Sequence, residues 1–156
     1  MRIQILAVGR LRNGPEKALI DDYITRFDRT GRALGLGPLN VIEVEDRKNQ
    51  GQKAEADLLV KSTPAGAYRI ILDERGKSLS SPKFAKAIAQ RRDQGVGDLS
   101  FWIGGADGHL PHMRDQADEA LSFGQMVWPH MLARVMLTEQ LYRTASILAG
   151  SPYHRD

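Results

Sequence analysis

The chain has 156 residues, of which 42% are hydrophobic and 26% are charged, and its formal net charge is +3. This length and composition are typical of one globular domain with its own core, so we expect a single domain over residues 1–156. The chain has no cysteine, which excludes disulfides, cysteine-ligated zinc and thiol catalysis and fits a cytoplasmic protein. No apolar run reaches the roughly 18 residues of a membrane span, and the short apolar start favours a strand over a signal peptide. The small positive excess permits an acidic partner such as RNA without requiring one.

The first half of the chain alternates between strand and helix signals. Apolar residues at helical spacing follow Pro15, which stands where a first helical residue is expected. The predicted elements are a buried strand over 3–8, a helix from Pro15, a loop over 29–38, an edge strand over 39–44, a charged loop over 45–53 and a helix over 54–61.

The second half continues the same alternation. Its predicted elements are a strand over 68–72, a helix that Ser81 and Pro82 cap and Gly95 ends, a strand over 99–103, a helix over 111–121, a short strand over 125–128 and a helix over 131–149. Strands that alternate with helices predict an α/β fold, a mostly parallel sheet with helices on both faces.

The last predicted helix is apolar on more than one face. Such a helix packs on the sheet and also on a second surface, which is either the domain's own helices or another subunit. The residues that carry this pattern are Leu132, Val135, Met136, Leu137, Leu141, Ala145 and Leu148.

The stretch 99–108 is the first candidate for a ligand site. The apolar strand LSFWI runs directly into Gly104 and Gly105, with Gly108 close behind. A glycine turn between a strand and a helix lets a ligand approach the backbone closely, and it equally serves a plain connection that needs positive φ. The turn lacks the G-x-G-x-x-G spacing of a dinucleotide site.

Other short motifs exclude three kinds of site: a nucleotide-binding P-loop, a metal site and a serine-hydrolase site. Gly76-Lys77-Ser78 ends like a P-loop, but Ile71 stands where that motif needs glycine. His109 and His112 lie three residues apart without a supporting carboxylate signature, so we expect surface histidines and no metal site. No serine-hydrolase elbow is present. Within 123–130 we expect Met126 and Val127 to be core residues of the short strand.

The C-terminal tail combines Tyr153, His154 and Arg155. A polar, disordered end is one interpretation of this tail. The other is nucleotide recognition, because an aromatic ring stacks on a base and a guanidinium holds a phosphate.

Several segments occur together, in this order, in one known family. They are MRIQILAVGRL at the start, RIILDERGKSLSS at 69–81, IGGADG at 103–108, FGQMVWPH at 123–130, RVMLTEQLYRTASI at 134–147 and PYHR at 152–155. Each motif alone is weak, but together they cover nearly the whole chain. The sequence therefore resembles the SPOUT-superfamily methyltransferases that modify the N3 atom of a pseudouridine in large-subunit ribosomal RNA.

The resemblance implies a fold, a cofactor and an assembly. The implied fold carries a C-terminal trefoil knot, which general rules of chain topology would not predict. The implied assembly is a homodimer, and the implied cofactor is S-adenosylmethionine. Carried over by position, the cofactor-binding residues are Leu72, Gly104, Gly105, Phe123, Gly124, Gln125, Met126, Val127 and Trp128.

The resemblance also implies a substrate, ribosomal RNA in the assembled ribosome. Tyr153, His154 and Arg155 are then the candidate catalytic residues that hold the target nucleotide, with Arg155 pairing with a phosphate. Either His154 or bulk solvent takes the proton from N3. Two alternatives are a non-catalytic RNA-binding α/β module and a small-molecule methyltransferase on the same scaffold. Binding of S-adenosylmethionine would separate the first alternative from the two enzymes.

Overall fold

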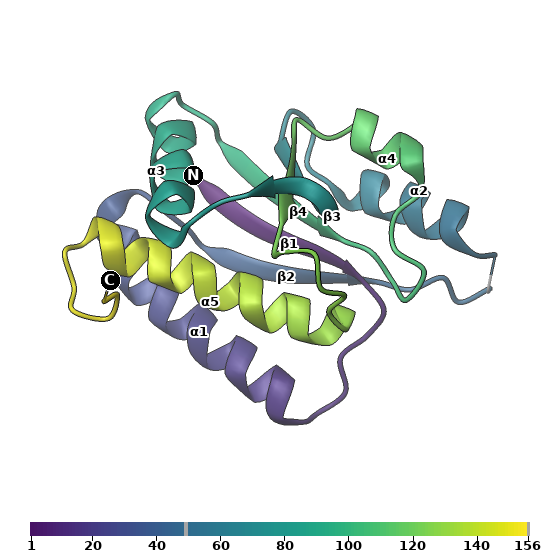
Figure 1. The fold of residues 1–156 in the computed structure, drawn as a ribbon, viewed down its shortest axis with the longest axis horizontal. Helices are drawn as coiled ribbons and strands as arrows, with labels where there is room; N and C mark the ends of the chain where they lie inside the picture. The colour runs from purple at the N-terminus through teal and green to yellow at the C-terminus, as the bar shows by residue number, and fades with distance from the viewer. Residues whose placement is uncertain (49, 156) are drawn as a thin grey trace.

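A parallel sheet with helices on both faces forms the body of the protein in the computed structural model, which describes residues 1–48 and 50–155 (Figure 1). The strand order is β2-β1-β4-β3-β5, and every neighbouring pair runs parallel. The strands are β1 (Arg2–Val8), β2 (Leu39–Val44), β3 (Tyr68–Ser78), β4 (Asp98–Ile103) and β5 (Glu119–Ser122). The helices are α1 (Pro15–Gly31), η1 (Arg32–Leu34), α2 (Gln52–Ser62), α3 (Ser81–Asp93), α4 (Pro111–Asp115) and α5 (His130–Leu148). The predicted fold class is confirmed, and β2 lies at an edge as expected.

Each face of the sheet carries its own core because side chains alternate along the strands. In β1, Ile3 and Ile5 pack with Phe27 of α1 and with residues of α3 and α5. Leu6 faces the other way and packs with Leu59 of α2 and with residues of α4. Helices α1, α3 and α5 therefore cover one face, and α2 and α4 cover the other.

Strand β3 is longer than predicted and leaves the sheet in its middle. Leu72 and Lys77 both pair opposite Leu121 of β5, so residues 73–76 project between them. A Cβ on Gly76 would lie only 2.6 Å from the backbone of Ala120, so no other residue fits this crossing without a shift. This projecting segment lies at the carboxyl end of the sheet's central strands, where open α/β sheets bind ligands.

Three predictions for the connecting segments were wrong. The stretch 29–38 is not all loop, because α1 continues to Gly31 and η1 follows it. The helix predicted over 111–121 ends at Asp115, because residues 119–122 pair with β3 as a strand. The strand predicted over 125–128 is a loop. Tertiary pairing along β3 overrides the weak helical preference of residues 119–122.

Candidate functional site

A cleft of about 780 Å³ opens at the carboxyl ends of β3 and β4. It is bounded by the segment that projects from β3, the glycine turn after β4, the loop after β5 and the first turn of α5. This volume falls in the range of small-molecule sites. Eight of the nine residues predicted to bind a cofactor line it, namely Leu72, Gly104, Gly105, Phe123, Gly124, Met126, Val127 and Trp128. Gln125 is exposed and is not among the lining residues.

The glycine turn forms one wall of the cleft with its backbone. A Cβ on Gly104 would lie 2.9 Å from the backbone of Gly108, and one on Gly105 would lie 3.2 Å from Val8 Cγ1 and from Glu55 Oε2. Gly104 is therefore needed because the turn packs on its own backbone, whereas a side chain at Gly105 would have to displace Val8 and Glu55 slightly. Positive φ is required only at Gly108, which has a φ of 71°.

The loop after β5 forms an exposed apolar wall. Met126 and Val127 are 73% and 86% exposed, so the prediction that they belong to the core was wrong. The loop is held at its base, because the hydroxyl oxygen of Ser122 accepts a hydrogen bond of 3.1 Å from the Gly124 amide. Apolar side chains this exposed mark a surface that a ligand or partner covers.

An ion pair that the sequence did not single out lies in the cleft. Arg114 Nη2 of α4 is 3.0 Å from Asp73 Oδ2, and the Arg75 amide donates to Asp73 Oδ1 at 2.8 Å. Burial raises the pKa of Asp73, but the bonds from Arg75 and Arg114 outweigh it, so the pKa lies below its usual value. The position of Asp73 at a strand end was the one signal in the sequence that pointed to this group.

The two histidines of the 109–112 stretch differ in environment. His112 is exposed as expected, whereas the His109 ring is largely buried beside the cleft, so that prediction was wrong for His109. Burial lowers the pKa of His109, against smaller opposing effects of a hydrogen bond to the Trp102 backbone and of the charge of Asp73. Within residues 1–48 and 50–155, no three histidine, aspartate or glutamate side chains gather as a metal site would need.

The C-terminal tail lies away from the cleft and is fastened to α5. The Tyr153 hydroxyl donates to Glu139 Oε1 at 2.9 Å, and the Tyr153 ring packs on Tyr142 with centroids 4.6 Å apart. Arg143 binds the same Glu139 oxygen at 2.5 Å and lies 3.2 Å from His154 Nδ1. Burial raises the pKa of Tyr153, and its bond to Glu139 adds to the effect.

The distance between tail and cleft follows from helix geometry. Glu139 is six residues beyond Ala133, the last residue of α5 that lines the cleft, so about 9 Å of α5 separates them at 1.5 Å per residue. Arg155 is exposed. The structure therefore does not bring the three candidate catalytic residues of one chain together with that chain's own cofactor-binding residues.

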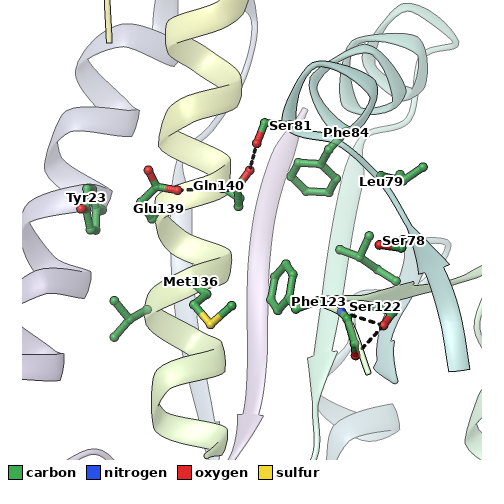
Figure 2. Close-up of a pocket in the computed structure, with 13 residues that line it drawn as sticks. Tyr23, Ser78, Leu79, Ser81, Phe84, Ser122, Phe123, Met136, Glu139 and Gln140 are labelled. Carbon is green, nitrogen blue, oxygen red and sulfur yellow. Dashed lines mark hydrogen bonds between the residues drawn. The ribbon is translucent and has the colours of Figure 1, made fainter. Parts of the chain in front are cut away.

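A second cavity of about 470 Å³ lies along the outer face of α5, between α1 and α3 (Figure 2). Tyr23, Phe84 and Met136 line it together with Glu139, the residue that holds Tyr153. Phe123 and Gly124 line both cavities, so the two meet at the loop after β5. The tail is thus anchored beside the outer face of α5.

None of the helices in the described part of the chain has the length and apolar character to cross a membrane.

A family model and related proteins each match almost the whole length of this chain. Residues 1–154 match the sequence model of a family described as "Predicted SPOUT methyltransferase". A protein of Ruegeria pomeroyi named ribosomal RNA large subunit methyltransferase H is 70% identical over 155 residues, which are 99% of each chain. A protein of the same name from Roseobacter denitrificans is 67% identical over 156 residues and 100% of each chain.

A solved structure supports the fold. A probable methylase family protein from Haemophilus influenzae aligns with 99% of this chain and 70% of its own length, with a TM-score of 0.51 at 12% identity. The family match and the identity to full-length relatives agree with the order of motifs and with the parallel sheet. The chain belongs to the family of SPOUT methyltransferases.

Proposed function

We propose that this protein transfers a methyl group from S-adenosylmethionine to the N3 atom of a pseudouridine in large-subunit ribosomal RNA. The observation that carries the proposal is the cleft at the carboxyl ends of β3 and β4, where the glycine turn, the segment that projects from β3 and the loop after β5 converge. The names of the full-length relatives support ribosomal RNA as the substrate.

The cleft residues fit this cofactor. When bound, S-adenosylmethionine supplies a methyl group made electrophilic by a sulfonium. Leu72, Met126 and Val127 offer apolar contacts for its organic part, and the carboxylate of Asp107 offsets its positive charge, whereas Asp73 is already paired with Arg114. The backbone of Gly104 and Gly105 lines the cleft, so its amide and carbonyl groups can contact the cofactor directly.

The residues of the chain mainly align the donor and the acceptor, because methyl transfer is an in-line displacement. Tyr153 and Arg155 hold the target nucleotide, with the guanidinium of Arg155 on a phosphate. The proton on N3 must leave as the bond to carbon forms, and His154 or bulk solvent accepts it. The trefoil knot expected from the family resemblance stays a prediction.

The active protein is a homodimer in this proposal, and the tail of one subunit completes the site of the other. The tail does not line its own cleft, and Glu139, which holds Tyr153, lies six residues beyond Ala133 on α5. The tail is anchored beside the second cavity, and Leu19, Met131 and Leu132 are exposed on α1 and α5 of the same side. A second copy that covers this face would receive the tail of its partner. We infer a cytoplasmic location, because the substrate is ribosomal.

The substrate in this proposal is the assembled ribosome. A chain of net charge +3 with 6% aromatic residues has few means of reading single-stranded RNA by stacking. Such a chain is better suited to recognising the folded surface of a ribosome than the bases of single-stranded RNA.

The test has two stages. Calorimetric titration with S-adenosylmethionine should show saturable binding, and its absence would favour the non-catalytic RNA-binding module. Ribosomes that carry the unmethylated pseudouridine should then be methylated at N3, as measured by mass spectrometry of digested RNA. We expect little product on naked RNA of the same sequence, and equal rates on both would contradict the ribosomal requirement. Cofactor binding without methylation of either RNA would favour the small-molecule methyltransferase.

A further inference from the structure

A buried arginine connects the last helix to the first strand. Arg134 lies on α5 one turn after His130, and its side chain is 1% exposed. Its Nη2 atom donates to the carbonyl oxygens of Val8 at 2.6 Å and Gly9 at 2.9 Å, and its Nη1 atom donates to Glu43 Oε1 at 3.2 Å. One guanidinium therefore joins α5 to the carboxyl ends of β1 and β2.

This arrangement is costly for stability. Burial lowers the pKa of Arg134, and the charge and hydrogen bond of Glu43 oppose that shift. Among the described residues, Arg134 Nε is a buried donor with no hydrogen-bond partner. A long apolar side chain would fill the same space without removing a charge from water. Unlike an apolar side chain, the planar guanidinium holds several hydrogen-bond acceptors in fixed directions.

The acceptors of Arg134 lie directly behind the glycine turn. The side chain of Val8 packs against that turn, since a Cβ on Gly105 would be 3.2 Å from Val8 Cγ1. On the opposite side, His130 and Ala133, which precede Arg134 on the same helix, line the cleft. The side chain of Arg134 thus connects the two walls that face each other across the cleft.

We propose that Arg134 is a positioning residue, which sets the separation between the glycine turn and the first turn of α5 and so determines the affinity for the methyl donor. The identity of this ligand rests on the proposed function, whereas the positioning itself does not. Without the guanidinium, the first turn of α5 shifts relative to Val8, and the cleft no longer has one fixed width.

The test separates positioning from stability. Arg134→Met removes the fork and leaves Glu43 without its cation, although the Leu11 amide still donates to Glu43 Oε1, so both stability and affinity should fall. The double variant Arg134→Met/Glu43→Gln removes the uncompensated carboxylate as well. We expect its urea midpoint to recover only the part of the loss that the Glu43 charge causes, because the carbonyl oxygens of Val8 and Gly9 still lack their donor. Calorimetry should show no recovery of affinity, with at least tenfold weaker binding of S-adenosylmethionine and of S-adenosylhomocysteine. Arg134→Lys keeps the charge without the fork and should also bind weakly.

A matched control and a measurement without ligand complete the test. Arg91, an ion-paired residue of α3 that does not line the cleft, should lose stability but no affinity on substitution by methionine. Hydrogen exchange of the double variant without ligand should be faster at Gly108 and Ala133, whose amides bond within the two walls.

Wild-type affinity and wild-type exchange in the double variant would overturn the proposal, even if Arg134→Met alone does not fold. If the wild-type protein itself fails to bind S-adenosylmethionine, the proposed function fails, and the exchange measurement still decides the role of Arg134.

Discussion

At the scale of single residues, the shape of the cleft depends on its glycines as much as on its larger side chains. A Cβ on Gly104 would collide with the Gly108 backbone, and one on Gly105 would press on Val8 and Glu55. A branched side chain at Gly105 would point into the protein and not into the cleft. It would therefore act on a ligand by displacing the turn.

Replacing Gly105 by valine should weaken the binding of S-adenosylmethionine at least tenfold in calorimetry. Overpacking against Val8 should also lower the free energy of unfolding by about 1–3 kcal/mol, measured by urea titration. Gly97 offers a matched control, because it precedes the same strand and has nothing within 4 Å of its Cβ position. Gly97→Val should leave the affinity unchanged. A folded Gly105→Val protein with normal affinity would contradict this role of the turn.

His109 should make the stability of the protein depend on pH. Its pKa is lower in the folded state than in the unfolded chain because the ring is buried, so the unfolded state binds more protons in acid. This contribution to stability is fully present above the unfolded value of about 6.5 and is lost as the pH falls towards the folded value. The slope it contributes in that window is at most about 1.4 kcal/mol per pH unit.

Urea titrations of the wild type and of His109→Gln between pH 7.5 and pH 5 check this effect, and the variant should show the smaller pH dependence. The exposed His112 provides the control, because His112→Gln should retain the wild-type slope. Identical slopes in the wild type and His109→Gln would show that the buried ring does not titrate in this range.

At the scale of elements, α5 brings three separate surfaces together. Its buried side packs on the sheet through Leu137 and Leu141, its first turn lines the cleft, and its outer face carries the second cavity (Figures 1 and 2). The tail folds back onto that outer face through Glu139.

Mixing two inactive proteins should restore activity if the tail acts on the partner. One protein carries Gly105→Val with an intact tail, and the other ends after Pro152 with an intact turn. Random exchange makes half of the dimers hybrid, and each hybrid has one complete site. The activity on ribosomes should then return to about a quarter of the wild-type value.

Exchange of subunits must be verified for this result to count, for example by mass spectrometry of the intact dimers. A tail that serves its own subunit leaves a defect at every site of the mixture. No recovery after verified exchange would therefore decide against the arrangement in trans.

At the scale of the whole molecule, the face formed by α1 and α5 leaves apolar side chains exposed. Sedimentation at micromolar concentration should give twice the 17.4 kDa mass of the chain. Leu132→Glu places a charge on this face and should shift the equilibrium to monomers, with loss of methylation. Lys53→Glu, on α2 and so on the opposite face of the sheet, should remain dimeric and active. A wild-type monomer that methylates ribosomes would contradict the dimer.

The sequence by itself determined the α/β class, the edge position of β2 and the central strand β4, because hydrophobic periodicity reports which faces of an element are buried. It also placed the glycine turn at the end of a buried strand. Gly104 and Gly105 can be predicted from the sequence because they directly follow that strand in the chain.

Only the tertiary structure decided the parts that depend on contacts distant in the chain. Residues 119–122 form a strand because β3 is beside them, and Met126 and Val127 are exposed because no element of residues 1–48 and 50–155 covers their loop. Arg134 looks like an ordinary polar position in a helical pattern, yet it binds carbonyl oxygens more than 120 residues earlier. Periodicity describes one element at a time, whereas these interactions exist only after the elements have packed together.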